Sequence, residues 1–397
     1  MRRIYFATGE SFHSLYNELL QYPPSGYEFV VHKRIGEKEE KLSVRQVGVK
    51  ALKSTHMLPY FRTLSWYSRW RTGAFLQNVP DDMDLVYSAN RLFLNKKPWV
   101  LATEHLGDLC PVIYDLEHLS LYKMLIENVL NSRYCKKIIP YLNIGKTTLL
   151  KNLNCKYFEG KIEVVHLGIH PKNFVKEHES EKVTFLFVGT ANVSNIPGSF
   201  EVRGGKELLE AFSILNKKYD NLELILRAKV PDYIRSKYSS MLGSKNVKIV
   251  DGVLPFEQFD QVMKSADILI FPGYITPAMT LLDAMSYELP VIATNIEGIP
   301  EMVTDNRNGF LIERKDNTPY TSMCAGKALP NLNDLARNTL DTKVVNGLIE
   351  KTSILIENKA LRQKMGKDGR KEVEKRKFSL EKRNEKLKRI FDEAIND

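Results

Sequence analysis

Short apolar runs alternate with longer amphipathic stretches along most of this chain. In the second half, the runs end at Gly, Pro, Asn or charged residues, and the stretches between them carry apolar residues at helical spacing. This alternation predicts an α/β fold built on a parallel sheet. The strands expected in this half are Thr184–Val188, Leu222–Leu226, Val247–Val250, Ile268–Phe271 and Val291–Ala293.

The first half carries a similar set of apolar runs. The strands expected there are Ile4–Ala7, Glu28–His32, Asp84–Ser88, Trp99–Thr103 and Lys137–Pro140. A further strand-like run, Ile162–Leu167, closes this half, and the charged stretch Lys172–Lys182 predicts a linker. A chain of 397 residues is longer than a single hydrophobic core usually accommodates, so two domains are expected.

Two later regions complete the pattern. Pro, Asn and Gly in Arg314–Asn333 predict a longer loop or an insertion. The tail Lys371–Asp397 is interpreted as one charged helix with an apolar side made of Leu380, Leu387, Ile390 and Phe391.

The segment Phe271–Phe310 is the most informative part of the chain. It predicts a strand, a helix, a second strand and a glycine-and-acid turn that opens another helix. Ligands of parallel sheets bind at the carboxyl ends of the strands, which correspond here to the loops Gly273–Thr280 and Thr294–Pro300. Asp283 and Glu301 are expected near these loops, each close to a helix start.

Composition excludes several classes of protein. Hydrophobic residues make up 43% and charged residues 27%, values that are ordinary for a globular chain. The four cysteines are scattered without CxxC spacing, which predicts reduced thiols in a cytoplasmic protein and no disulfide frame or zinc site. No apolar run reaches the ~20 residues that span a bilayer, and the start lacks a signal-peptide core.

The net charge of +10 suits an anionic partner, although solubility alone would also explain it. Nucleic-acid motifs are absent, so nucleic acid is not expected as a partner. The stretch Lys41–Pro80 carries seven Lys or Arg, no Asp or Glu, and interleaved aromatics such as Trp66 and Trp70. This composition favours docking on anionic lipid headgroups about as much as it favours a basic helix with its aromatics in the core.

Two apparent motifs carry no chemistry. Gly145-Lys146-Thr147-Thr148 looks like a phosphate-binding loop, but the earlier glycine that this motif requires falls on Pro140. The residues there fit an amphipathic helix instead. Glu104 and His105 suggest a metal site, yet the HExxH spacing is missing, so no metal is expected.

Several motifs in the second half resemble the donor-binding half of retaining glycosyltransferases of family 4 (glycosyl transferases group 1), a GT-B family. The likeness covers roughly Phe185 to Leu311 well, and it is weak in the N-terminal half. The motifs that match in order and spacing are Phe187–Gly189, Gly204–Lys206, Leu208–Phe212, Leu282–Met285, Pro290–Thr294, Gly298–Glu301 and Asn308–Leu311. In addition, Gly168-Ile169-His170 with Phe174 resembles the family's interdomain signature, with His170 in place of Asp.

The resemblance implies a GT-B fold, with two Rossmann-like domains facing a central cleft. Residues 1–170 would then bind the acceptor, residues 171–375 would bind the nucleotide-sugar, and residues 376–397 would form a helix crossing back to the first domain. It implies transfer of a sugar from a nucleotide-diphosphate donor to an acceptor hydroxyl with retention, in cell-surface glycan or glycolipid synthesis. The donor is a substrate, and no cofactor is implied. The expected location is cytoplasmic, with peripheral attachment to the inner face of a membrane as an option.

The resemblance also assigns roles to residues of this chain. Arg203 and Lys206 are the candidates for the diphosphate, and Asp283 is the candidate for the ribose. The residues expected to line the donor pocket are Gly189, Thr190, Gly204, Gly205, Ile275, Gly298 and Glu301. On the acceptor side, Glu104 and His105 follow the strand Trp99–Thr103 and are the weaker candidates.

One departure from the family pattern opens an alternative. The first Glu of the family's acidic pair falls on Ile275, whose side chain has neither charge nor an acceptor atom. The second class of function is therefore a catalytically impaired GT-B protein that binds a nucleotide-sugar or glycan, or acts as a scaffold. A nicotinamide-dependent oxidoreductase is excluded because no GxGxxG motif follows an early strand.

Overall fold

The computed structural model places most of the chain in two compact units. It describes residues 1–7, 14–31, 79–104, 106–109, 119–174, 176, 181–189, 198–252, 254–315 and 332–396. The first unit contains Met1–His166 together with Asn384–Asp397, and the second contains Leu167–Met323 and Lys327–Arg383. Each unit has its own parallel sheet, so the protein has two α/β domains.

The first unit is built on a five-stranded parallel sheet in the order β2-β1-β3-β4-β5. The strands are β1 (Arg2–Ala7), β2 (Tyr27–Val31), β3 (Leu85–Ala89), β4 (Trp99–Thr103) and β5 (Cys135–Pro140). The expected strands are confirmed, with ends that move by up to two residues. Every residue of β3 and β4 is buried, as a parallel sheet covered on both faces requires.

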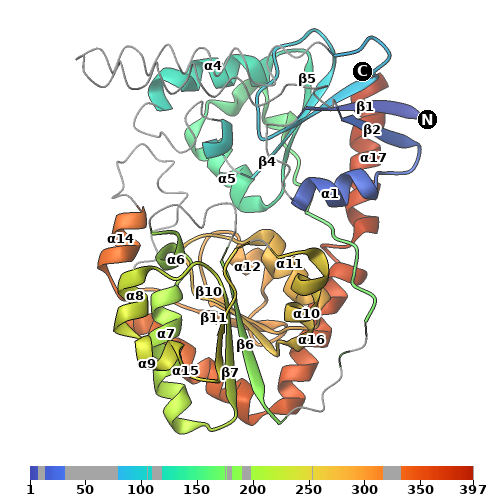
Figure 1. Ribbon diagram of the computed structural model, residues 1–397. Helices are drawn as coiled ribbons and strands as arrows, with labels where there is room; N and C mark the ends of the chain where they lie inside the picture. The colour runs from blue at the N-terminus through green and yellow to red at the C-terminus, as the bar shows by residue number, and fades with distance from the viewer. Residues whose placement is uncertain are drawn as a thin grey trace, which may run out of the picture. The chain divides into compact units, whose positions relative to one another are not determined.

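Helices of the first unit flank this sheet (Figure 1). They are α1 (Ser14–Gln21), α4 (Leu119–Asn131) and α5 (Asn143–Asn152), with short 3-10 turns at Leu106–Leu109, Cys155–Tyr157 and Glu159–Lys161. Helix α5 contains Gly145-Lys146-Thr147-Thr148, so the helical interpretation of that segment is confirmed.

The expected strand Ile162–Leu167 is wrong. The segment follows β5 with two hydrogen bonds, from the Glu163 amide to the Ile138 carbonyl (2.9 Å) and from the Val165 amide to the Pro140 carbonyl (3.1 Å). Only one isolated bridge, between Ile138 and Ile162, results. Contact with one side of β5 is enough to bury the apolar residues, which is why their pattern looked like that of a strand.

The second unit has a six-stranded parallel sheet in the order β11-β10-β9-β6-β7-β8. The strands are β6 (Val183–Val188), β7 (Leu222–Arg227), β8 (Val247–Ile249), β9 (Ile268–Phe271), β10 (Val291–Thr294) and β11 (Gly309–Ile312). The five expected strands are confirmed, and β11 was not expected as a strand. Its first residue explains why it can pair here, since a Cβ at Gly309 would lie 2.1 Å from the Val291 carbonyl oxygen.

Helices cover both faces of this sheet (Figure 1). Helices α7 (Gly205–Lys218) and α15 (Thr342–Glu357) pack together on one face, while α11 (Ala278–Ser286) and α16 (Lys359–Glu374) pack together on the other. The other helices of this unit within the described residues are α6 (Ser199–Val202), α8 (Asp232–Lys237), α9 (Ser239–Leu242), α10 (Phe256–Ser265), α12 (Ile299–Met302) and α14 (Leu332–Asn338). The core between the sheet and α7 is rich in buried aromatics, including Phe185, Phe187 and Phe212.

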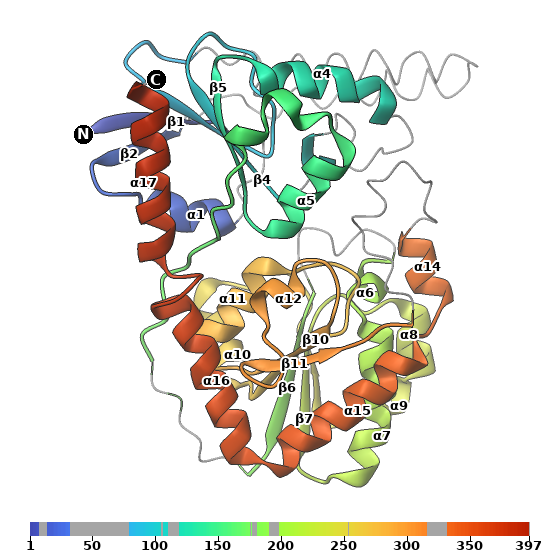
Figure 2. The same cartoon turned by 180° about the vertical axis from the view of Figure 1, so that it is seen from behind.

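The expected single helix over Lys371–Asp397 is also wrong, because two helices share it (Figure 2). Helix α16 ends at Glu374, and α17 (Leu380–Asn396) begins after a short break. Ser379 provides the start signal: its Oγ accepts a hydrogen bond from the Lys382 amide (3.3 Å), the geometry of a helix N-cap, and Phe378 before it is buried. In the first unit, Phe391 of α17 contacts the rings of Tyr27 and Phe29.

Some sequence predictions fall outside the described residues. The basic stretch Lys41–Pro80 lies there except for its last two positions, as do most of Arg314–Asn333 and part of Lys172–Lys182. Among the helices that the structure describes, none has the length and apolar character needed to cross a bilayer.

Candidate functional site

The strand order of the second unit creates a switch point between β6 and β9. From β6 the chain runs outward through β7 and β8, and from β9 it runs outward in the opposite direction through β10 and β11. Loops that leave neighbouring strands in opposite directions open a crevice at the carboxyl edge of the sheet, where ligands of such folds bind. The residues that follow the two strands at this point are Gly189 and Pro272–Ile275.

Close backbone contact builds one wall of this site. Gly204, the N-cap of α7, has φ 81°, and a Cβ there would lie 2.3 Å from the Pro272 carbonyl oxygen. The Tyr274 amide donates to the Val202 carbonyl (2.8 Å). The turn between α6 and α7 therefore rests directly on the segment that leaves β9. This contact places the first turn of α7, which is the positive end of the helix dipole, at the switch point.

Arg203 lies in this turn but points partly inward. Its Nη1 donates to the Ser199 carbonyl (2.9 Å) and the Ser199 hydroxyl (2.7 Å). Burial lowers the pKa of Arg203 to about 10. Its buried Nε has no hydrogen-bond partner among the described residues. A guanidinium has more donors than the contacts with Ser199 use, so donors remain for an anion at the turn.

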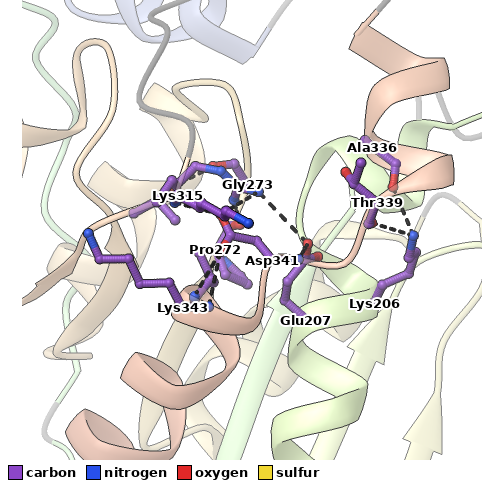
Figure 3. Close-up of polar contacts among 12 residues, drawn as sticks. Lys206, Glu207, Pro272, Gly273, Lys315, Ala336, Thr339, Asp341 and Lys343 are labelled. Carbon is purple, nitrogen blue, oxygen red and sulfur yellow. Dashed lines mark hydrogen bonds and ion pairs between the residues drawn. The ribbon is translucent and has the colours of Figure 1, made fainter.

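Lys206 has a structural partner that the sequence did not reveal. Its Nζ donates to the carbonyls of Ala336 (3.0 Å), Arg337 (2.8 Å) and Thr339 (2.6 Å) at the end of α14 (Figure 3). The last carbonyls of a helix lack partners within the helix, so a lysine there caps it. Burial also lowers the pKa of Lys206. To bind a phosphate, Lys206 would therefore have to give up its hydrogen bonds to the α14 carbonyls and form new ones to phosphate oxygens.

The carboxyl ends of β9 and β10 are tied together by side-chain hydroxyls. Thr294 Oγ1 donates to the Gly273 carbonyl (2.5 Å), and the Gly298 amide donates to Thr276 Oγ1 (2.9 Å). The structure thus brings Gly298 beside the segment that contains Ile275. Glu301 lies in the short helix α12 that follows.

Asp283 does not lie at a helix start, contrary to expectation. It falls in the second half of α11 and is half-buried. Its charge is one of the influences, after burial and Asp260, that raise the pKa of Tyr287. Helix α11 begins at Ala278, inside the expected loop Gly273–Thr280, so Asp283 lies within the helix.

Ile275 is packed in an apolar cluster. It packs against the buried cluster of Val202, Tyr274 and Ala336, as do Leu332 and Leu335 of α14. The position at which the family has a Glu is therefore occupied by a side chain that anchors α14 to the β9 segment.

Sequence reasoning missed Arg314. The side chain is fully buried; Nη1 donates to the Pro272 carbonyl (2.9 Å), and the guanidinium carbon lies 3.5 Å from the centroid of the Tyr274 ring. Its Nη2 lies 3.8 Å from a Glu207 carboxylate oxygen and 3.7 Å from an Asp341 oxygen. Burial raises the pKa of Glu207, and the nearby Arg314 charge opposes this rise. The sequence pattern did not single it out, because Arg314 stands in the charged run Glu313-Arg314-Lys315 after a strand that was not expected.

In the first unit, Glu104 follows β4 at the carboxyl edge of the sheet. Its amide donates to Asn90 Oδ1 (3.3 Å), and Asn90 Nδ2 donates to the Tyr16 hydroxyl (3.3 Å). Asn90 follows β3 and has φ 55°, a left-handed conformation that Asn tolerates. Glu104 is exposed, so its carboxylate is accessible at this edge. The other two candidates, His105 and Thr190, lie outside the described residues.

Comparisons with known proteins agree with this architecture. Residues 176–324 match a family model described as glycosyl transferases group 1. The chain is 22% identical over 344 residues to an uncharacterized glycosyltransferase of Methanocaldococcus jannaschii, covering 82% of this chain and 79% of the relative. It is 24% identical to the capsular polysaccharide biosynthesis glycosyltransferase CapM of Staphylococcus aureus, over 49% of this chain and 44% of that protein.

Solved structures extend the likeness over nearly the whole chain. Sucrose-phosphate synthase from Thermosynechococcus elongatus has a TM-score of 0.59 at 14% identity, with 99% of this chain and 98% of that chain covered. Anabaena HepE in complex with UDP-glucose has a TM-score of 0.54 at 13% identity, with 99% of each chain covered. At such identities these structures establish the fold. Taken with the matched segment and the named relatives, they identify this chain as a glycosyltransferase of GT-B fold that carries a glycosyl transferases group 1 segment.

Proposed function

We propose that the second unit binds a nucleotide-diphosphate sugar at the switch point between β6 and β9. The observation that supports this most directly is the contact of Gly204 with Pro272, which brings the N-terminus of α7 to this point. Helix α7 spans Gly205–Lys218 and is long enough for a developed dipole. Amides at a helix start bind phosphate because their N–H groups and the positive end of the helix dipole face the anion.

The proposed site divides the donor between three sets of residues. The diphosphate lies against the α7 amides, with Arg203 as the adjacent cation and Lys206 as a second cation once it leaves the α14 carbonyls. The carboxylate of Asp283 accepts hydrogen bonds from the hydroxyl groups of the ribose. The segment around Ile275 and the Gly298–Glu301 turn lie on neighbouring strand ends and line the rest of the pocket.

The proposed reaction is transfer of the glycosyl unit with retention of configuration. The acceptor oxygen forms a bond to the anomeric carbon while the bond from that carbon to the diphosphate oxygen breaks, and the acceptor proton leaves to the diphosphate. Charge develops on the leaving diphosphate, so the main task of the protein is to stabilise it with donors fixed in advance. The α7 amides and Arg203 would perform this task. Retention rests on the likeness of the motifs to family 4.

The acceptor is proposed to be a glycan or a lipid-linked glycan in cell-surface polysaccharide synthesis. The name of the relative CapM, a capsular polysaccharide biosynthesis glycosyltransferase, supports the polysaccharide part of this proposal. Glu104 at the carboxyl edge of the first unit is the candidate contact for it, with His105 beside it in sequence. The basic aromatic stretch Lys41–Pro80 is proposed to attach the enzyme to an anionic bilayer. Co-sedimentation with anionic liposomes tests this attachment, which should weaken as salt rises because the attraction is screened within a Debye length.

The second candidate function is a GT-B protein that binds a donor without transferring the sugar. The packing of Ile275 among apolar side chains favours it, since no carboxylate is available at that position. The relatives named as glycosyltransferases do not favour it. A donor screen separates the two functions: an enzyme releases nucleoside diphosphate from at least one nucleotide-sugar, whereas a binder shows affinity without release.

A further inference from the structure

Four segments of the second unit meet at one buried arginine. Arg314 follows β11, Tyr274 belongs to the segment that leaves β9, Glu207 lies in the first turn of α7, and Asp341 precedes α15. Asp341 is itself the N-cap of α15, accepting from the Lys343 (3.1 Å) and Val344 (3.3 Å) amides. Its own amide donates to Glu207 (3.3 Å), a contact that joins α15 to α7 (Figure 3).

The contacts of Arg314 are unequal. The hydrogen bond to the Pro272 carbonyl is short (2.9 Å) and the ring of Tyr274 is in stacking contact, whereas both carboxylates lie at 3.7–3.8 Å, beyond hydrogen-bond range. A planar guanidinium can donate along its edge and stack on an aromatic face at the same time, which a lysine ammonium cannot do. The specific contacts therefore go to the β9 segment, and the carboxylates supply the counter-charge.

A buried cation is expensive to keep, so a simpler core would favour an apolar residue at this position. The gain from the arginine is the position of Pro272–Ile275. Arg314 adds a carbonyl hydrogen bond and a ring contact to the other described contacts of this segment, which are made by the Tyr274 amide, the Gly273 carbonyl, the Tyr274 side chain with Thr339, and apolar packing. We propose that Arg314 is a positioning residue, holding Pro272–Ile275 against the first turn of α7 so that both walls of the donor site keep their spacing. This inference rests on the proposed function for its effect on the donor, and on contacts alone for its effect on the segment.

The test uses three variants and a matched control in the full chain. Arg314→Lys keeps the charge but loses the stacking and the planar fork, and Arg314→Met removes the charge. Tyr274→Leu removes the ring and leaves the ion pairs in place. The control is Arg362→Met: Arg362 of α16 is also a buried arginine that donates to a backbone carbonyl, that of Leu355, but it has no contact with the β9 segment among the described residues.

The first readout needs no ligand. Hydrogen–deuterium exchange of the peptide that contains the Tyr274 amide should accelerate at least fivefold in Arg314→Lys, Arg314→Met and Tyr274→Leu, compared with Arg362→Met at matched global stability. The second readout is calorimetry with UDP, whose affinity should fall at least fivefold in the same three variants and stay within twofold of wild type in the control.

Each outcome has a distinct meaning. Unchanged exchange at position 274 in both Arg314 variants and in Tyr274→Leu would overturn the positioning role, whether or not the affinity for UDP changes. Accelerated exchange together with unchanged UDP affinity would confine Arg314 to the segment and remove it from the donor site. Accelerated exchange in a protein whose wild type binds neither UDP nor any other nucleoside diphosphate would support the role of Arg314 in holding the segment, and would contradict the proposed donor site instead.

Discussion

Gly204 and Pro272 approach so closely that a Cβ on the glycine would lie 2.3 Å from the proline carbonyl oxygen. The backbone at Gly204 also has φ 81°, which L side chains adopt only under strain. Two independent constraints thus require glycine at the point where α7 begins.

We predict that Gly204→Ala lowers the free energy of unfolding by roughly 2–5 kcal/mol. About 1–2 kcal/mol comes from the left-handed backbone, and about 1–3 kcal/mol from forcing an atom into a packed contact. Gly252→Ala is the matched control, because Gly252 has φ 90° but a Cβ added there would meet nothing within 4 Å. Chemical denaturation of both variants measures the difference. Equal destabilisation would show that the Pro272 contact imposes no constraint.

The cations of the α7 turn are predicted to bind phosphate. In calorimetry, Arg203→Ala and Lys206→Ala should each lower the affinity for UDP and for inorganic pyrophosphate several-fold or more. The reason is that losing a charged hydrogen bond costs ~1.5–3 kcal/mol.

Lys161→Ala is the control for the lysine variant. Lys161 donates to the Leu130 (3.1 Å) and Ser132 (2.9 Å) carbonyls at the end of α4, so it also caps a helix but lies in the first unit. If Lys206→Ala behaves like Lys161→Ala, with reduced stability and full affinity for UDP, then Lys206 only caps α14.

Asp283 is predicted to contact the ribose and not the phosphates. Asp283→Asn should therefore weaken UDP binding while leaving pyrophosphate binding unchanged, with little loss of thermal stability. Asp260→Asn is a suitable control, because Asp260 also acts on Tyr287, accepting a hydrogen bond from its hydroxyl (2.5 Å). Equal loss of UDP affinity in both variants would mean that Asp283 acts through the packing around Tyr287.

Stability should depend on pH through Glu207. Burial raises the pKa of this carboxyl in the folded protein, so the folded state binds its proton more tightly than the unfolded state does. The contribution of Glu207 to stability is then fully present below its ordinary pKa and is lost as pH rises through the raised value. Denaturation of wild type and Glu207→Gln at pH 5 and pH 7 measures this effect. The free energy of unfolding of wild type, relative to that of the variant, should be higher at pH 5 than at pH 7. The opposite trend would mean that Arg314 outweighs burial.

The local pattern of apolar residues was sufficient to predict most strands, but it missed β11 and the break between the last two helices. Each strand of the two sheets except β11 could be recognised as a short apolar run, because parallel strands are buried on both faces. β11 was missed because Gly309 and the charged residues after Ile312 leave a run too short to stand out. The break at Ser379 was missed because helical spacing continues across it, although Ser preceded by Phe is a start signal.

The place of the Arg203–Gly204 turn could be predicted from local sequence, whereas the roles of the site residues stay predictions. Gly204 and Arg203 were correctly placed in a turn before a helix, since glycine pairs at such turns are local features. The partners of Lys206 lie at the end of α14, more than a hundred residues away in the chain. Those of Arg314 lie in the segment that leaves β9, in α7 and at the start of α15. Such contacts depend on the strand order of the sheet, which hydrophobic periodicity does not encode.

A donor screen on the purified protein tests the central claim most directly. Release of nucleoside diphosphate would be measured across UDP-, GDP-, ADP-, CDP- and dTDP-linked sugars, with and without membrane extract as a source of acceptor, for wild type, Arg203→Ala and Asp283→Asn. We predict release from at least one diphosphate donor by wild type and a loss of at least tenfold in both variants. Wild-type protein that releases no nucleotide from any donor, and binds no nucleoside diphosphate in calorimetry, would contradict a donor site at the β6–β9 switch point.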